Sequence, residues 1–309
     1  MRAGSFVTTL RHHALAYRGQ RDLIDHLAPF VREGVELGEP VLVLERQEVN
    51  DELRDELGRD AARVGFIDMQ EVGRNPARIL SVWHDFLAAH PGRPARGVGE
   101  PLWPGRSPAE AAECHLHEAL INRMLADVPV WIVCPYDATA LDSEDLERMT
   151  HTHPVVCRDG TPAPSGGFEL RLALRNALSV PLAEPTWAPP AVPFGRDDLP
   201  AMRWAVESHA IAAGLRAQRC ADVAIVVSEL ATNSVRHAGG GGSLRSWTEG
   251  DRVVHEVRDT GWFVDPTAGS RLPPSDQPGG RGLWLVHCLS DLVQLRTSAA
   301  GTTIRVTLG

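Results

Sequence analysis

The sequence contains no lysine, so arginine supplies all 31 of its basic residues. A phosphate-binding loop of the Walker A type needs a lysine that reaches the phosphates, so this way of holding a nucleotide is excluded. Positive charge is also scarce, because 40 acidic residues give the chain a formal net charge of −9. Binding to a nucleic-acid backbone requires clustered positive charge, so we expect no direct nucleic-acid partner.

Long apolar runs and paired cysteines are missing as well. No run approaches the roughly 20 apolar residues that cross a bilayer, and the N-terminus has no apolar signal core. We therefore expect a cytoplasmic protein that does not contact a membrane. The five cysteines are scattered and odd in number, without C-x-x-C pairs, which predicts reduced and mostly buried thiols.

The hydrophobic content is sufficient for two domains, at 43% of 309 residues. In the first part of the chain, apolar runs alternate with segments of helical spacing, which is typical of an α/β layer fold. The predicted strands are 40–45, 63–69 and 128–137, and the predicted helices are 50–57, 75–89 and 107–125. The last helix is expected to begin after Ser107, with Pro108 in its first turn and Glu110 three residues after Ser107.

Proline-rich residues 161–194 interrupt this pattern and predict a connector around one short element. The elements expected after it are helices at 198–213 and 219–238, a hairpin of strands at 243–247 and 252–258, a long loop, a short helix and two closing strands. This order predicts a two-layer α/β sandwich. The glycines at 239–242 are interpreted as a helix stop before the hairpin. The predicted divisions are a first domain at 1–160, a connector at 161–194 and a second domain at 195–309.

Three polar residues, each four apart, lie on the predicted helix 219–238: Glu229, Asn233 and His237. At about 100° per residue they border the apolar arc of this helix, so we expect them to point inward toward a cavity. An asparagine oxygen with a nearby carboxylate suits Mg²⁺, which takes oxygen ligands and keeps several positions for water and phosphate. The alternative is a helix with a capping histidine and a solvated glutamate.

Two motifs after the hairpin add to this set. Asp259 ends a strand and Gly261 follows it, so the carboxylate can accept an adenine amino group while the backbone passes close to the ring. Such a D-x-G triplet alone usually marks a turn. In the last strand, Thr302 can reach the adenine end, although threonine in a strand is more often only a strand former.

A glycine cluster precedes the short helix near the C-terminus. Gly279, Gly280 and Gly282 place flexible backbone amides at the start of this helix, which is a natural phosphate site. Arg281 can add a positive charge toward phosphate. By itself such a cluster is more commonly a linker or a tight turn.

The order of these four motifs resembles the GHKL ATPase superfamily, with its Bergerat-type fold, from about Phe194 to Gly309. It is most similar to the bacterial anti-sigma-factor serine kinases: ELATNSVRHA matches the asparagine box, and RDTG and GGRGLWLV match the glycine boxes. The resemblance implies ATP and Mg²⁺ as cofactors, Glu229 as general base and Asn233 as magnesium ligand. The ATP contacts that it implies are Asn233, His237, Asp259, Gly261, Gly280, Arg281, Gly282, Leu283 and Thr302. One departure is Phe263, which stands where the family's D-x-G-x-G box has its second glycine.

Polar residues of the first domain are interpreted as a sensory pocket. Cysteine, histidine and carboxylate are the common ligands of transition metals, so these residues can form a ligand or metal site. Their spacing fits no standard site, so ordinary core or surface roles stay open. The predicted pocket residues are His12, Glu100, Trp103, Glu113, Glu118, Cys134, Tyr136, Asp137 and His153.

Four segments of this domain, GEPLW, AAECHLHEALIN, WIVCPYD and THP, resemble the MEDS sensory domain of bacterial and archaeal regulators over about residues 8–157. The resemblance implies a RecA-like α/β fold that senses an unknown small ligand. Both resemblances together imply a regulator that sequesters a sigma factor. They leave open whether it also phosphorylates a serine or threonine of an anti-anti-sigma antagonist of the STAS type.

Two alternative functions stay open. One is a non-catalytic binding module in which ATP controls the binding of a partner. The other is a histidine kinase, which needs a phosphoacceptor histidine on a helical hairpin, whereas only a single helix with His209 precedes the ATPase motifs. The sequence also leaves the oligomeric state open, with a homodimer among the options.

Overall fold

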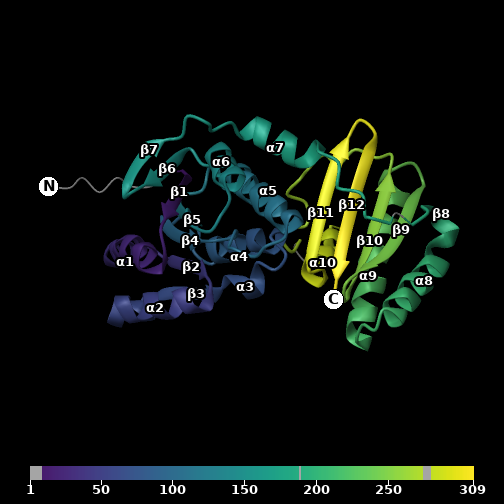
Figure 1. Cartoon of the computed structure of the whole chain (residues 1–309), viewed down its shortest axis with the longest axis horizontal. Coiled ribbons are helices and arrows are strands. Elements are labelled where there is room, and N and C mark those ends of the chain that lie inside the picture. The colour runs from purple at the N-terminus through teal and green to yellow at the C-terminus, as the bar shows by residue number, and fades with distance from the viewer. Residues whose placement is uncertain (1–8, 188, 274–279) are drawn as a thin grey trace. The chain divides into compact units, whose positions relative to one another are not determined.

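The chain divides after Leu174 into two compact units, each built on its own sheet. The computed structural model describes residues 9–187, 189–273 and 280–309. Both units combine strands with helices, so the predicted α/β class is confirmed (Figure 1). Among these residues, no helix is both long and apolar enough to cross a membrane.

The sheet of the first unit has the strand order β3-β2-β4-β5-β1-β6-β7 over the described residues. Its strands are β1 (Arg11–Tyr17), β2 (Val41–Glu45), β3 (Val64–Asp68), β4 (Ala95–Gly99), β5 (Val130–Asp137), β6 (Val155–Arg158) and β7 (Thr161–Pro164). Neighbouring strands are parallel except for β7, which pairs antiparallel with β6. The helices are α1 (Gln20–Glu36), α2 (Gln47–Leu57), α3 (Met69–Val72), α4 (Ala77–Ala88), α5 (Pro108–Met124) and α6 (Ser143–Thr152).

Helices cover both faces of this sheet, as consecutive residues of β4 demonstrate. Gly97 lies against Trp83 of α4, and a Cβ at this glycine would overlap the indole ring. Arg96 points to the other face, where its side chain packs against Gly34 of α1 and pairs with Glu33 at 2.8 Å. Strands buried on both faces are the usual condition of a parallel sheet.

Helix α5 begins with the capping box that the sequence predicts. The Glu110 amide donates to Ser107 Oγ at 3.3 Å, and the Ser107 amide donates to Glu110 Oε2 at 2.8 Å. The middle of the helix is buried, including polar residues such as Glu118 and Asn122. This helix therefore carries charged and hydrogen-bonding groups into the interior, where they need partners.

The sheet of the second unit is antiparallel, with the strand order β11-β12-β10-β9-β8 over the described residues. Its strands are β8 (Val192–Gly195), β9 (Gly241–Glu249), β10 (Arg252–Asp259), β11 (Leu292–Ser298) and β12 (Gly301–Leu308). Helices α8 (Leu199–Ala212), α9 (Ala217–His237) and α10 (Arg281–Leu289) pack on one face. Val227 and Leu230 of α9 share a core with Val257 and Ile304 of the sheet. The predicted two-layer sandwich is confirmed.

The other face of this sheet carries a network of arginines around Glu256, whose side chain is fully buried. Arg245 donates to Glu256 Oε1 at 2.9 Å, Arg258 donates to the same oxygen at 2.7 Å, and Arg305 donates to Oε2 at 2.7 Å. Glu184, which precedes β8, pairs with Arg245 at 2.6 Å and with Arg258 at 2.8 Å. The chain before β8 is thereby attached to this face.

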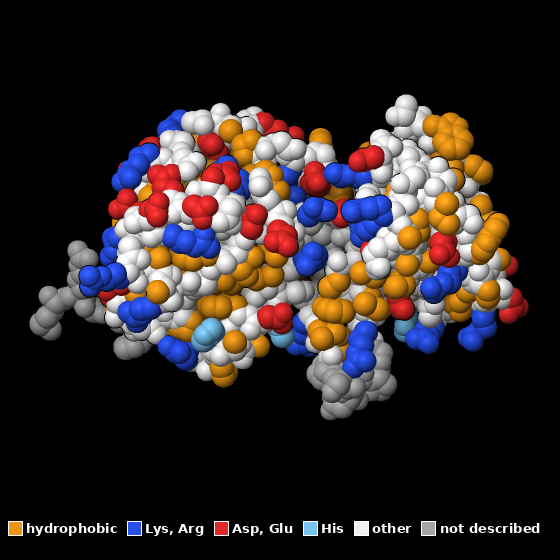
Figure 2. Space-filling view, turned by 90° about the horizontal axis from the view of Figure 1, so that it is seen from below, with side chains coloured by type: hydrophobic (Ala, Val, Ile, Leu, Met, Phe, Trp, Pro, Cys, Tyr) orange, Lys and Arg blue, Asp and Glu red, His pale blue; other side chains and the backbone are white. Residues whose placement is uncertain are grey.

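Elements of both units extend into the range 161–194 predicted as a connector. Strand β7 belongs to the first sheet and Val192 begins β8 of the second, with α7 (Leu170–Ser179) between them. The glycines after α9 have two roles: Gly239 and Gly240 have positive φ and end the helix, whereas Gly241 and Gly242 belong to β9. On the face shown in Figure 2, arginine and acidic side chains are interspersed.

Candidate functional site

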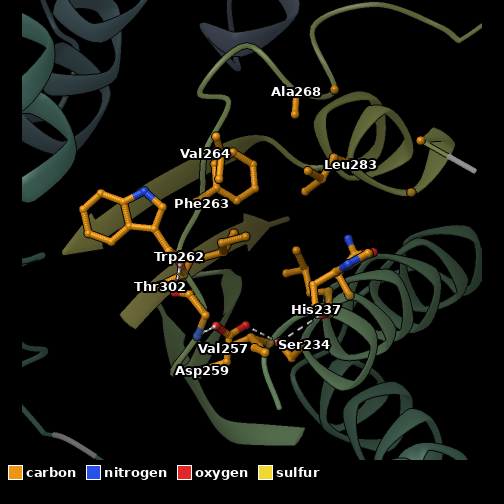
Figure 3. Close-up of a pocket in the computed structure, with 18 residues that line it drawn as sticks. Ser234, His237, Val257, Asp259, Trp262, Phe263, Val264, Ala268, Leu283 and Thr302 are labelled. Carbon is orange, nitrogen blue, oxygen red and sulfur yellow. Dashed lines mark hydrogen bonds between the residues drawn. The ribbon is translucent and has the colours of Figure 1, made fainter. Parts of the chain in front are cut away.

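A pocket of about 370 Å³ lies between α9, the end of β10 and the start of α10 (Figure 3). This volume is in the range of small-molecule sites, about 300–1,000 Å³. Its apolar walls come from Leu230, Val257 and Ile304. The predicted ATP contacts that line it are Asn233, His237, Asp259, Gly261, Gly280, Gly282, Leu283 and Thr302.

Asp259 is held at the end of β10 by two hydrogen bonds. Its Oδ2 accepts from Ser234 Oγ of α9 at 2.6 Å, and its Oδ1 accepts from the Gly261 amide at 2.9 Å. Thr302 Oγ1 of β12 donates to the Gly261 carbonyl at 2.8 Å. Each carboxylate oxygen has two lone pairs, so Asp259 keeps the capacity to accept a further hydrogen bond in a fixed direction. This end of the pocket suits the amino group of an adenine.

Gly261 brings the backbone close to the end of α9. A Cβ at this position would lie 2.8 Å from Cβ of Ala238, a distance that real side chains do not tolerate. The glycine of the D-x-G triplet is therefore required by packing as well as by its place in the pocket. The interpretation as a turn alone does not explain this close approach.

The start of α10 forms the opposite end of the pocket. Gly280, the N-cap, has a left-handed backbone (φ 82°) and has no side chain of its own that could cap the helix. The first amides of a helix lack partners within the helix and carry partial positive charge, which suits phosphate. A Cβ at Gly282 would overlap Glu229 Oε2, so the Glu229 carboxylate lies directly against this helix start. Gly279 lies outside the described residues.

Glu229 and Arg281 are not among the residues that line this pocket. Glu229 lies one turn before Asn233 on α9, and Arg281 is the first residue of α10. His237 ends α9 and is exposed at the pocket. The predicted roles of Glu229 and Arg281 therefore stay predictions.

Phe263 lines the pocket at the position where the family pattern has a glycine. Its amide donates to Thr297 Oγ1 of β11 at 3.2 Å, so the backbone there is tied to the sheet. Figure 3 shows its ring on the side that faces Leu283 of α10. Gly269 then packs against α10, because a Cβ there would lie 2.8 Å from Cβ of Leu283. The described part of this loop thus forms one wall of the pocket.

The donor atoms around the pocket fit Mg²⁺ and a nucleotide. Asn233 offers an amide oxygen and Glu229 a carboxylate one turn earlier, and oxygen atoms are the ligands that Mg²⁺ prefers. Sequence reasoning missed Ser234 and Thr297. Ser234 directly follows the asparagine of the motif, but its contact with Asp259 depends on how α9 packs on β10, which no local pattern reveals.

The alternative phosphoacceptor His209 lies on α8, which packs on α9 within the second unit. Its ring contacts the ring of buried His255, with centroids 5.4 Å apart, and its Nε2 lies 3.4 Å from Thr248 Oγ1. Burial lowers the pKa of His209.

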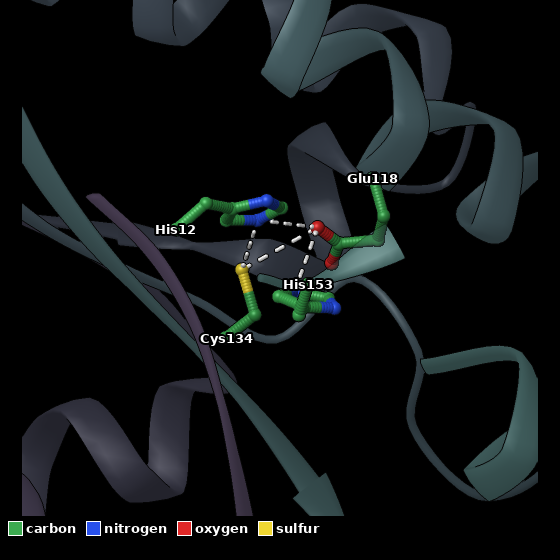
Figure 4. Close-up of side chains that lie close together, drawn as sticks. All are labelled: His12, Glu118, Cys134 and His153. Atoms are coloured by element: carbon green, nitrogen blue, oxygen red, sulfur yellow. Dashed lines mark hydrogen bonds and ion pairs between the residues drawn. The ribbon is translucent and has the colours of Figure 1, made fainter. Parts of the chain in front are cut away.

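Four residues predicted for the sensory pocket meet in the interior of the first unit: His12, Glu118, Cys134 and His153 (Figure 4). Their ligand atoms all lie within 4.8 Å of one another. Glu118 Oε2 is 3.0 Å from His12 Nε2 and 3.4 Å from His153 Nε2. Cys134 Sγ lies 3.3 Å from His12 Nε2 and 3.4 Å from Glu118 Oε2. They come from β1, α5, β5 and the residue after α6.

Burial is the largest single influence on the pKa values of His12, Glu118 and Cys134 in this cluster. It lowers the pKa of His12 and raises the pKa of the Cys134 thiol well above its usual value. Burial also acts to raise the pKa of Glu118, but hydrogen bonds and charge from His12 and His153 outweigh it and hold that pKa well below its usual value. The cluster thus favours an ionised carboxylate in the protein interior.

The other predicted sensory residues have different partners. Glu100 is buried and accepts from Tyr17 OH at 2.7 Å, and its pKa is raised by burial. Trp103 stacks under the Arg106 guanidinium, and Asp137 caps a turn through Thr139. Tyr136 packs edge-on against His153, and Glu113 is buried on α5. The predicted pocket is therefore divided between the four-residue cluster, which Tyr136 contacts through His153, and separate local interactions of the other residues.

Both resemblances agree with comparisons to known families. Residues 11–154 match the MEDS family, the MEthanogen/methylotroph, DcmR Sensory domain, and residues 192–308 match the histidine kinase-like ATPase domain. No curated protein matches the chain. The second match implies ATP binding by the domain that holds the pocket. The two matches together support a kinase-like regulatory protein, in which a segment similar to the MEDS sensory domain precedes a segment similar to a histidine kinase-like ATPase domain.

Proposed function

We propose that this protein is an ATP-binding anti-sigma regulator. It sequesters a sigma factor and transfers phosphate from ATP to a serine or threonine of an anti-anti-sigma antagonist of the STAS type. The MEDS domain provides the input by binding a small ligand. The proposal is supported by the two matched families and by the residues gathered at the pocket.

The contact between Glu229 and Gly282 carries the kinase part of the proposal. It places a carboxylate beside the helix start that suits the phosphates. In the proposed transfer, the acceptor hydroxyl gives its proton to Glu229 while its oxygen bonds to the terminal phosphorus, and the bond to the leaving ADP breaks. A positioned general base of this kind typically contributes 10² to 10⁴ in rate.

The other pocket residues bind and orient the substrate. Asp259 accepts the adenine amino group, and the first amides of α10 hold phosphate oxygens. Asn233 would hold Mg²⁺, which supplies charge neutralisation of the phosphates when bound. Asn233 and Glu229 therefore act on different steps, although they share one face of α9.

A radiolabelled phosphotransfer assay tests the proposal. The full chain is first used to capture partners from the native cell, and mass spectrometry identifies sigma factors and antagonists among them. With that antagonist, the wild type should transfer phosphate, and Glu229→Ala should lose about 10² to 10⁴ in rate while it still binds ATP and the sigma factor. Glu207→Ala on α8 is the matched control and should keep full activity.

Asn233→Ala should lower ATP affinity as well as turnover, which separates it from Glu229→Ala. Capture of no sigma factor or antagonist would contradict the regulatory part of the proposal. A wild type that transfers no phosphate while ATP still controls partner binding would contradict the kinase part. It would favour a nucleotide-controlled binding module, which the presence of Phe263 in the pocket wall supports.

A further inference from the structure

The hydrogen bonds of the two clustered histidines define which ring nitrogen carries the proton. Asn122 Nδ2 donates to the backbone carbonyls of Glu118 at 2.9 Å and Thr152 at 2.7 Å, so Asn122 Oδ1 is oriented as an acceptor. This oxygen lies 3.2 Å from His12 Nδ1, which must therefore be the N–H donor. His12 Nε2 then presents a lone pair to the cluster in the neutral ring.

The same argument shows which ring nitrogen of His153 carries the proton. Its Nδ1 lies 2.9 Å from the Met149 carbonyl, which can only accept, so the proton is again on Nδ1. In their neutral form, both rings therefore direct the lone pair of Nε2 toward the inside of the cluster, where a cation can accept it. Histidine ligands of metal sites commonly show this arrangement, in which the outer nitrogen donates to a backbone or side-chain oxygen and fixes the ring.

Four of the six distances between the inner atoms are close to those of a tetrahedron around one ion. For zinc bonds of about 2.0–2.3 Å, neighbouring donors in a tetrahedral site lie about 3.3–3.8 Å apart. The four close distances in this cluster are 3.0, 3.3, 3.4 and 3.4 Å, and all donors lie within 4.8 Å of one another. A single central cation would therefore reach all four with only small adjustments.

The charge of the cluster also fits a divalent cation. Glu118 contributes one negative charge, and a bound cation would replace the proton of the Cys134 thiol and so add a second, whereas the two neutral histidines add none. The side chains of His12, Glu118 and His153 are fully buried. Buried charges need compensation. Nitrogen and thiolate ligands with one carboxylate, in tetrahedral geometry, are typical of Zn²⁺.

We propose that His12, Glu118, Cys134 and His153 form a tetrahedral zinc site in the core of the MEDS domain. Four protein ligands leave no open position, so the ion acts by holding structure. It joins β1 and β5 of the sheet to α5 and to the end of α6. The site lies within the first unit, whereas the nucleotide pocket lies within the second, and the proposal is independent of the proposed kinase function.

Metal analysis of the full chain tests this site. After expression with zinc and removal of loose metal, the wild type should hold about one zinc per chain. Cys134→Ser should lower this content at least severalfold. Cys114→Ser, which alters another buried thiol of the same domain, should keep it, and so should Asn233→Ala in the nucleotide pocket.

If Cys134→Ser fails to fold, spectroscopy on the wild type still tests the proposed zinc site. Cobalt-substituted protein should show the visible bands of tetrahedral Co²⁺ and a thiolate charge-transfer band. X-ray absorption of the zinc form should give one sulfur at about 2.3 Å and three nitrogen or oxygen atoms at about 2.0–2.2 Å. Wild-type protein that holds no zinc after refolding with it, or zinc bound without sulfur, would overturn the proposal. Equal zinc content in Cys134→Ser and wild type would also overturn it.

Discussion

Ser234 of α9 donates a 2.6 Å hydrogen bond to Asp259 at the end of β10, and this bond joins the two elements that flank the nucleotide pocket. The second oxygen of Asp259 accepts from the Gly261 amide, so the carboxylate is fixed on both sides. A group oriented before the ligand arrives loses less conformational entropy on binding. The Asp259 carboxylate is therefore already in place in the protein before ATP binds.

Asp259→Asn is expected to weaken ATP binding at least about tenfold, because the adenine amino group loses a charged acceptor. Calorimetry on the full chain measures the change in affinity. Asp251→Asn, in the exposed turn between β9 and β10, is the control and should bind like the wild type. Equal affinities of Asp259→Asn and wild type would contradict the adenine assignment.

Ser234→Ala is expected to weaken ATP binding by about 1 kcal/mol, or roughly fivefold, because Asp259 loses one of its two supports. The effects of Ser234→Ala and Asp259→Asn should not add in the double variant, since the two side chains are in contact. Calorimetry on both single variants and the double variant measures this coupling. Additive losses would show that Ser234 does not act through Asp259.

Glu256→Gln is expected to lower the free energy of unfolding by about 3–5 kcal/mol, because it leaves buried Arg305 without its charge partner and buried Arg245 with only the exposed Glu184. Glu184→Gln removes an exposed member of the same network and should cost about 1 kcal/mol or less. Urea unfolding of both variants gives the comparison. Similar losses of unfolding free energy in Glu256→Gln and Glu184→Gln would contradict the expectation that the buried glutamate contributes more to stability than the exposed one.

Glu45→Gln is expected to change how stability depends on pH. The pKa of Glu45 lies well above its usual value of 4.5, because the group is buried and Glu100 is close. A raised carboxyl pKa gives stability at low pH that is lost as pH rises through the folded-state pKa. The unfolding free energy of Glu45→Gln relative to wild type should therefore increase as the pH rises above the usual carboxyl pKa of 4.5. Glu48→Gln, which changes an exposed carboxylate, is the control. If the difference in unfolding free energy between Glu45→Gln and wild type stays constant with pH, the raised pKa assigned to Glu45 is contradicted.

The sequence predicted the elements whose patterns are regular. Helix α9 shows apolar residues at helical spacing, and its polar stripe leads directly to the pocket that contains Asn233. Helix α5 has an explicit capping box at Ser107. For both helices, the local sequence pattern and the tertiary packing favour the same structure, so each helix could be predicted from this sequence alone.

Strand β4 was missed because its local signal is weak. Its sequence, ARGVG, contains an arginine and two glycines, which disfavour strands. Packing overrides this preference, since Gly97 leaves room for Trp83 and Arg96 pairs with Glu33. The sequence also named the members of the His12 cluster together with Glu100 and Asp137, which lie elsewhere, because distance along the chain does not reveal which groups meet across a sheet.

Trp83 occupies the space that Gly97 leaves free, so the two positions restrict each other during evolution. A side chain at position 97 requires a smaller residue at position 83, and a smaller residue at 83 alone opens a cavity in the core. Either single change therefore lowers stability, whereas a joint exchange can preserve the packed volume. We expect these two positions to covary among homologous MEDS domains.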